Sequence, residues 1–279
     1  MIDTITHRPA TPEETLAPET LDFYRRSMNL LREAKVPYLV GGAYAFARYT
    51  KIVRHTKDFD VFVHPRDARR ALDAFAQAGY TVDLKFPHWL GKAFQGDDFV
   101  DVIYSSGNGI ARVDDRWFKN AVEDEVLGIP VQLIPAEEMI WSKSFIMERE
   151  RYDGADVAHI LHARSGELDW ERLLDRFGEH WRVLLTHLLL FGYIYPEDAD
   201  RIPNRVMDRL LEKVGNENQH GGPEGHLCRG TILSRSQYLV DVEEWGYRDA
   251  RLVPVGGMNA EEIAHWTAAA REEEAKAKG

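Results

Sequence analysis

Tyr38-Leu39-Val40-Gly41-Gly42 is the stretch of this 279-residue sequence that decides its fold, together with the segment Asp58-Phe59-Asp60-Val61-Phe62-Val63. In the second segment polar and apolar residues alternate, which is typical of a β-strand, so Asp58 and Asp60 are expected on one face. At about 3.3 Å rise per residue, their Cα atoms would lie roughly 6–7 Å apart, close enough for both carboxylates to bind one cation. Like charges repel at this distance, so the pair indicates a Mg²⁺ ion between them.

The glycine pair marks a place where the backbone comes close to a ligand. Gly41 and Gly42 permit a close approach to a phosphate, and a helix predicted at 43–49 would direct its free N–H groups toward it. A Gly-Gly pair alone is explained by a turn, and an Asp-x-Asp alone by a solvated strand. Both motifs in this order and strand context indicate transfer of a nucleotidyl group.

A third acid lies in a later strand candidate. Asp101 is the one charge within Phe99-Val100-Asp101-Val102-Ile103-Tyr104, where burial of an unpaired carboxylate is costly. If this strand lies beside the strand that carries the first two acids, the three carboxylates share a face. Such a set would serve two Mg²⁺ ions and an incoming triphosphate. Asp97 or Asp98 is the alternative third acid if the strand is shifted.

The hydrophobic pattern predicts two lobes. Residues 20–135 alternate between helix and strand patterns, which predicts an α/β (α+β) catalytic domain built on a small mixed β-sheet with flanking helices. From residue 136 the pattern is almost wholly helical, so we predict a helical domain at 136–250. Residues 1–19 and 251–279 are predicted to be loose termini, the latter because its Ala/Glu/Lys-rich helix would fray.

Composition restricts the class of protein. The formal net charge of -11 argues against broad non-specific binding to nucleic acid, which needs a basic surface. The single cysteine excludes an internal disulfide and fits a reducing compartment. No leader pattern opens the chain and no apolar stretch is long enough for a membrane span, so we expect a cytoplasmic protein.

Taken together, Gly41-Gly42, Asp58-Phe59-Asp60 and Asp101 resemble the nucleotidyltransferase superfamily with the polymerase-β-like fold. Downstream, 139–143 (Met-Ile-Trp-Ser-Lys) and 151–157 (Arg-Tyr-Asp-Gly-Ala-Asp-Val) resemble the Lys…Arg-x-Asp-x-x-Asp helix pair of the AbiEii-type and lincosamide/aminoglycoside-type bacterial branches. The matches cover approximately residues 20–165.

The resemblance implies roles for the first set of residues. Gly41 and Gly42 would hold the nucleoside triphosphate, for example ATP. Asp58 and Asp60 would be metal ligands, and Asp101 the third ligand or the base for an acceptor hydroxyl. Two departures are evident: Gly42 replaces the serine of many relatives, and 43–46 lack the Arg-Asp of CCA-adding enzymes, an activity that we therefore set aside.

The downstream motif implies further roles. Lys143 would contact the triphosphate, Asp153 or Asp156 would support the active site or the acceptor, and Arg151 could pair with either acid. Each has a simpler interpretation, because Lys143 on a helix is as easily a surface lysine and the two acids could cap the helix near Gly154.

Three potential metal ligands lie near the C-terminus. His220, His226 and Cys228 lack a fourth partner and make an incomplete set for structural zinc. In the same region, Arg229 and Arg235 are candidates for a wall that faces the active-site cleft.

These observations predict an enzyme that transfers NMP from an NTP to a hydroxyl acceptor with Mg²⁺ (or Mn²⁺) and releases pyrophosphate. The acceptor could be a small molecule, a protein or RNA, and the acidic charge favours the first two. The alternative is a non-catalytic nucleotide-binding module, or a toxin-like partner of an antitoxin, although such a module has no need for three mutually repelling acids. The sequence leaves open which NTP is used, which molecule is the acceptor, and whether the chain forms a homodimer.

Overall fold

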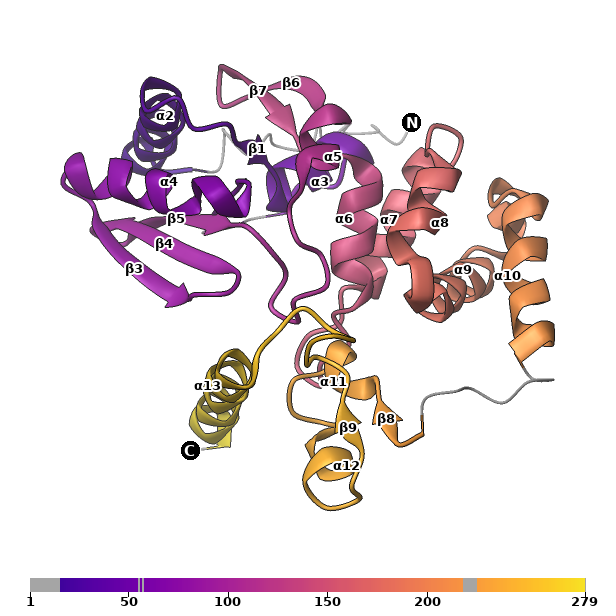
Figure 1. Cartoon of the computed structure of the whole chain (residues 1–279). Coiled ribbons are helices and arrows are strands. Elements are labelled where there is room, and N and C mark those ends of the chain that lie inside the picture. Colours follow the sequence, from indigo (N-terminus) through magenta and orange to yellow (C-terminus); the bar gives the residue numbers. More distant parts are fainter. Residues whose placement is uncertain (1–15, 55, 57, 218–224, 279) are drawn as a thin grey trace, which may run out of the picture.

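A seven-stranded mixed sheet with strand order β3-β4-β5-β2-β1-β7-β6 forms the centre of the N-terminal half (Figure 1). The computed structural model describes residues 16–54, 56, 58–217 and 225–278. The strands are β1 (Leu39–Val40), β2 (Asp58–Phe62), β3 (Thr81–Phe86), β4 (Leu90–Gln95), β5 (Asp98–Ile103), β6 (Val122–Val126) and β7 (Ile129–Leu133). The predicted α/β architecture with a small mixed sheet is confirmed.

Two helices cover one face of this sheet. Helices α2 (Pro18–Glu33) and α4 (Pro65–Gln77) pack their apolar sides on β3, β4 and β5. Phe59 and Val61 of β2 are fully buried on that face, and the ring of Tyr24 stacks on Phe59 with 4.8 Å between centroids. Because side chains alternate along a strand, the remaining residues of β2 are directed to the opposite face.

The second half of the sheet ends in an acidic strand. Strand β6 pairs with β7 in an antiparallel hairpin at the edge of the sheet. Glu123 and Glu125 are exposed there, which an edge strand tolerates because charged residues protect it from pairing with other chains. The short helix α5 (Asp115–Lys119) precedes this hairpin, and α3 (Gly42–Thr50) follows β1.

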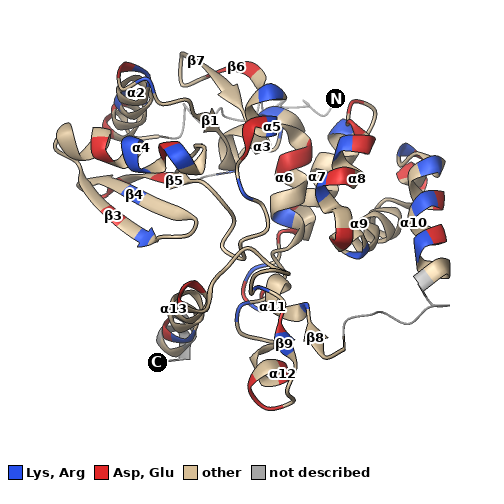
Figure 2. Ribbon diagram, viewed as in Figure 1, with Lys and Arg blue, Asp and Glu red and all other residues tan. Residues whose placement is uncertain are grey.

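A run of helices begins at Ala136. Its elements are α6 (Ala136–Ser144), α7 (Gly154–Arg164), α8 (Trp170–Phe177), α9 (Trp181–Ile194) and α10 (Asn204–Glu217), with 3₁₀ turns at Gly178–His180 and Pro196–Arg201. Helix α6 ends at Ser144, and the chain then forms a loop closed by a bridge between Met147 and Tyr152. Charges of both signs are interspersed along α8 and α10 (Figure 2). In the described part of the chain, no helix has the length and apolarity that a membrane crossing requires.

The chain then forms a small C-terminal unit. It contains β8 (Leu227–Cys228), α11 (Gly230–Leu233), α12 (Leu239–Glu243), β9 (Arg248–Asp249) and α13 (Ala260–Lys278). Helices α11 and α12 are both short, and the chain between them begins with an extended Ser234.

The prediction of a loose C-terminal segment at 251–279 is wrong for the residues that the structure describes. Arg251 is 1% exposed and binds Asp249 through two nitrogens, and α13 lies beside the β3–β4 hairpin (Figure 1). Trp266 of α13 packs edge-on against Phe86, with 4.8 Å between ring centroids. The Ala/Glu/Lys composition of the helix gave no indication that Trp266 packs against the sheet domain. At the other end, residues 1–15 lie outside the described part, and α2 already begins at Pro18.

Candidate active site

Three carboxylates occupy the face of the sheet that α2 and α4 leave uncovered. Strands β2 and β5 are parallel and in register, and Asp60 is paired with Asp101. Asp58 lies two residues earlier on β2 and is therefore on the same side. The structure thus brings the three predicted acids together. Asp98, an alternative third acid, faces the other way and accepts a hydrogen bond of 2.8 Å from Thr20 of α2.

The proximity of these acids changes how easily they ionise. Burial, together with the negative charges of Asp101 and Asp58, raises the pKa of Asp60 to about 7 from an ordinary 3.8. Burial also raises the pKa of Asp101, although Lys92 opposes this effect because its ammonium group donates a 2.6 Å hydrogen bond to Asp101 Oδ1. A site with this excess of negative charge favours a bound cation.

Both glycines are required by the packing around the acids. Gly42 has φ +54°, and a Cβ atom there would collide with Asp60 Oδ2. A Cβ atom on Gly41 would collide with the ring of Phe62, while the Gly41 N–H donates to the Asp60 carbonyl at 3.0 Å. Residue 42 therefore has no room for a serine side chain. The glycines end β1 and start α3, so the first N–H groups of that helix lie next to Asp60.

The carboxylates line a cavity of about 710 Å³ that three parts of the chain enclose. The sheet contributes the acids and Gly42. The end of α6 contributes Lys143, the connection from α6 to α7 contributes Arg151, and the C-terminal unit contributes Arg235 and Trp266. A cavity of this volume is typical of small-molecule sites.

Lys143 is held at the cavity by two acids. Its Nζ atom lies 2.8 Å from Asp153 Oδ2 and 2.8 Å from Asp156 Oδ2, and Arg151 binds Asp153 through two nitrogens at 3.0 Å. Lys143 is thus no loose surface lysine. Asp153 does stand at the N-cap position of α7, but its side chain forms no cap hydrogen bond. Lys143 is also near enough to Asp60 to oppose the rise of the pKa of Asp60.

Two basic residues of this region were missed from the sequence. Arg54 extends the charge network, with Nη1 2.5 Å from Asp156 Oδ1 and its guanidinium 4.5 Å from the centre of the Phe46 ring. Lys92 faces Asp101 from β4. The register of the β4–β5 hairpin places Lys92 opposite Asp101, so Lys92 could have been found from the sequence by pairing these two strands. No local sequence pattern points to Arg54.

The C-terminal unit is fastened to the rim of the cavity. Asn108 Nδ2 donates to the Ile232 carbonyl at 2.8 Å, and Ser234 Oγ donates to Glu148 Oε2 at 2.6 Å. The Arg235 guanidinium lies 4.6 Å from the centre of the Trp266 ring, so Arg235 does form part of the wall. Arg229 instead pairs with Glu179 at 2.8 Å.

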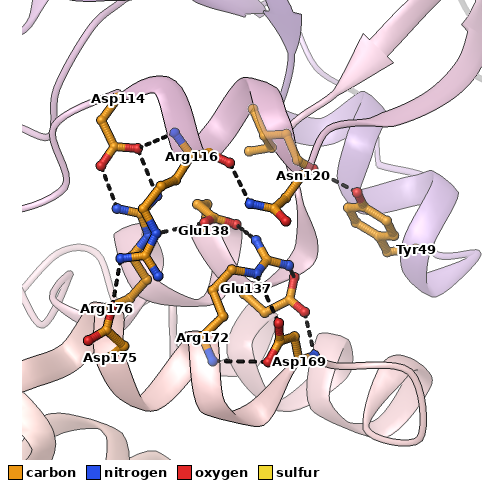
Figure 3. Close-up of polar contacts among 11 residues, drawn as sticks. Tyr49, Asp114, Arg116, Asn120, Glu137, Glu138, Asp169, Arg172, Asp175 and Arg176 are labelled. Atoms are coloured by element: carbon orange, nitrogen blue, oxygen red, sulfur yellow. Dashed lines mark hydrogen bonds and ion pairs between the residues drawn. The ribbon is translucent and has the colours of Figure 1, made fainter.

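A buried charge network fixes the orientation of α6, which carries Lys143 (Figure 3). Glu138, fully buried, accepts from Arg172 at 2.6 Å and from Arg176 at 3.1 Å, both on α8. Arg176 also donates two hydrogen bonds to Asp114, which caps α5. Glu137 completes the network with Arg172 at 2.6 Å. The network joins the helical region to the sheet domain next to the cavity.

The donor set at the acids fits a hard divalent cation, because Mg²⁺ and Mn²⁺ prefer carboxylate oxygens. Asp58 and Asp60 have no side-chain ion pair within the described residues, whereas Asp101 is paired with Lys92. Across those residues, no group of three or more His, Cys, Asp or Glu is already arranged to hold a metal ion. His226 is exposed and Cys228 is buried in β8; His220 lies outside the described residues.

Comparisons with known proteins agree with the predicted relationship. A family model described as aminoglycoside-2''-adenylyltransferase matches residues 25–90, which include the glycine pair and the Asp-x-Asp segment. Over these residues the match confirms the resemblance to the nucleotidyltransferase superfamily. A search of curated proteins finds no match.

Among solved structures, the chain is similar to the antibiotic-resistance factor ANT(2'')-Ia, with 15% identity, a TM-score of 0.45, and coverage of 62% of this chain and 98% of that one. It is similar to the lincosamide antibiotic adenylyltransferase LnuA in its lincomycin-bound form, with 12% identity, a TM-score of 0.37, and coverage of 52% and 96%. It is also similar to an antigenic nucleotidyltransferase-like protein from Paracoccidioides brasiliensis, with 13% identity, a TM-score of 0.40, and coverage of 67% and 93%.

Proposed function

We propose that this chain is a nucleotidyltransferase that moves a nucleoside monophosphate from a nucleoside triphosphate to a hydroxyl group of a small molecule and releases pyrophosphate. The observation that carries the proposal is the pairing of Asp60 with Asp101 on parallel strands, beside Gly42 and at a cavity of about 710 Å³. The family-model match, to an adenylyltransferase that acts on aminoglycosides by its description, supports the same class of reaction.

In this mechanism, Asp58 and Asp60 would hold the divalent cation, and Asp101 would be either the third ligand or the base for the acceptor hydroxyl. Bound there, a divalent cation would neutralise the triphosphate and the charge that develops on its oxygens. The N–H groups at the start of α3 approach the phosphates, because Gly42 leaves the backbone uncovered there. Lys143, fixed by Asp153 and Asp156, adds positive charge at the same end of the cavity.

The bond changes are those of an in-line displacement. The acceptor oxygen forms a bond to the α-phosphorus and loses its proton, while the bond from the α-phosphorus to the bridging oxygen of pyrophosphate breaks. The residues of the site therefore position reactants and stabilise charge rather than form a covalent intermediate.

A small molecule is the favoured acceptor because the cavity is enclosed on three sides. The C-terminal unit forms one wall of the cavity with Arg235 and Trp266. We expect this wall to contact the acceptor. The acidic net charge of -11 disfavours RNA, whose phosphates need a basic surface.

The test uses each of the four nucleoside triphosphates, labelled at the α-phosphate, with Mg²⁺ or Mn²⁺ and a small-molecule cell extract. We expect the wild-type chain to transfer label from one of them and to release pyrophosphate. The Asp60→Asn variant should be inactive, and Asp208→Asn, at an exposed position on α10, should behave as the wild type. Nucleotide binding without pyrophosphate release would instead support a non-catalytic module.

A further inference from the structure

A row of charged residues crosses the sheet on the cavity side. Strand pairing places Asp83, Lys92, Asp101 and Asp60 next to one another on β3, β4, β5 and β2. Residues paired in register point to the same side, so Lys92 stands between two acids on the face that carries the catalytic candidates. Of its two neighbours, Lys92 forms an ion pair with Asp101, at 2.6 Å.

The Lys92 side chain is held in this position by its surroundings. Its side chain is 21% exposed and that of Asp101 is 13% exposed, so the pair is shielded from bulk water. The Nζ atom also lies 4.1 Å from the centre of the Phe99 ring, in the range of a cation–π contact. A lysine with both an anionic and an aromatic partner loses side-chain conformational freedom, so its positive charge stays at one position.

We propose that Lys92 is a positioning residue of the carboxylate cluster formed by Asp58, Asp60 and Asp101. Its ammonium group binds one oxygen of Asp101, and the net charge that remains on the cluster is one that a single divalent cation neutralises. Three carboxylates carry three negative charges, and Lys92 reduces the total to two. The sequence alone led us to expect two Mg²⁺ ions for the same acids. The inference rests on the proposed function only in treating these acids as the cation site.

The other nearby cations do not share this role. Lys143 acts on Asp60 through its charge, but its ion pairs are with Asp153 and Asp156, and that of Arg151 is with Asp153, so neither forms an ion pair with the three acids. Among ion pairs of the described residues, Lys92 is the one cation that contacts any of the three acids. Removal of its charge should therefore change cation binding more than removal of any distant lysine.

The test measures the binding of Mn²⁺ alone to the full chain, by calorimetry and by the electron paramagnetic resonance signal of free Mn²⁺. Lys92→Met and Lys92→Gln should bind Mn²⁺ on the order of tenfold more tightly than the wild type, because a repelling charge has been removed. Lys92→Arg should stay near the wild type. Lys119→Met, at an exposed position on α5, is the matched control.

Thermal unfolding gives a second measurement that does not depend on turnover. In EDTA, Lys92→Met should melt at a lower temperature than the wild type, because Asp101 has lost its partner, and Mn²⁺ should raise its Tm more than that of the wild type. If Lys92→Met does not fold in EDTA, Lys92→Gln prepared in Mn²⁺ supplies the affinity from the dependence of its Tm on Mn²⁺ concentration.

The outcomes separate this inference from the proposed function. Mn²⁺ affinities of the Met and Gln variants equal to that of Lys119→Met, or weaker, would overturn the role of Lys92, even if nucleotidyl transfer is found. Tighter Mn²⁺ binding by both variants without any transfer by the wild type would support the role of Lys92 and count against the proposed function.

Discussion

The α-carbon of Gly42 lies against the carboxylate of Asp60, so residue 42 has no space for a side chain. We expect Gly42→Ala to displace Asp60 and to reduce nucleotidyl transfer about 100-fold, the effect of a displacement of about 1 Å in an active site. The matched control is Gly79→Ala, because Gly79 also has a positive φ, +88°, but nothing within 4 Å of the added atom. Both variants should lose about 1–2 kcal/mol for the backbone conformation. Equal transfer rates for the two variants would contradict the tight contact.

The elevated pKa of Asp60 predicts a pH dependence of stability in the absence of metal. The pKa is about 7 in the folded chain and 3.8 ordinarily, so between these values the folded state binds a proton that the unfolded state does not. The free energy of unfolding should therefore fall as pH rises from about 4 to about 7 and then level off.

Asp60→Asn removes this dependence. At pH 8 and in EDTA we expect the variant to be more stable than the wild type by about 2–4 kcal/mol, which corresponds to a Tm higher by several degrees. At pH 4 the two should be similar. Asp208→Asn serves as control and should follow the wild type at every pH; a wild-type Tm that rises from pH 5 to 8 would contradict the assignment.

The network around Glu138 predicts a large stability effect far from the acids. Glu138→Ala leaves Arg172 and Arg176 buried without their shared partner and should lower the free energy of unfolding by about 3–5 kcal/mol. The exposed pair of Glu171 on α8 with Arg209 on α10 is the comparison, and Glu171→Ala should cost under about 1 kcal/mol. Denaturant unfolding measures both, and similar values for the two variants would show that the buried network is unimportant.

Trp266 tests the role of the C-terminal unit in the cavity wall. Trp266→Ala should raise the acceptor KM roughly tenfold, equivalent to about 1.4 kcal/mol of lost binding, with little change in the KM for the nucleotide. Trp245 is 63% exposed and outside the cavity, so Trp245→Ala is the matched control. A rise confined to the nucleotide KM would place the nucleotide, not the acceptor, against this wall.

Local patterns in the sequence were sufficient to predict the acidic face. The alternation around Asp58 and Asp60, and the lone Asp101 in an apolar run, predicted both strands and their polar face, because burial of the other face leaves a period of two residues. The order of these motifs also carried the resemblance that the family model confirms.

The partners of the acids were not predictable in this way, because they depend on contacts between distant segments. Lys92 meets Asp101 only through the register of β4 with β5, and Arg54 meets Asp156 across the fold. The anchoring of α13 depends on a few side chains, such as Trp266 packed on Phe86 and Thr267 bound by Arg251, within a helix whose composition is otherwise that of a solvated tail. Helix α6 ends at Ser144 because the following residues bind the C-terminal unit, as Met147 N–H does when it donates to the Leu233 carbonyl at 3.1 Å.

The central claim is that Asp58, Asp60 and Asp101 act as one site, and the most direct measurement is the rate of label transfer from an α-labelled nucleoside triphosphate by Asp101→Asn. We predict a loss of at least about 100-fold relative to Asp208→Asn, with the far-ultraviolet circular dichroism spectrum unchanged. Transfer by Asp101→Asn at the rate of the Asp208→Asn control would contradict the claim.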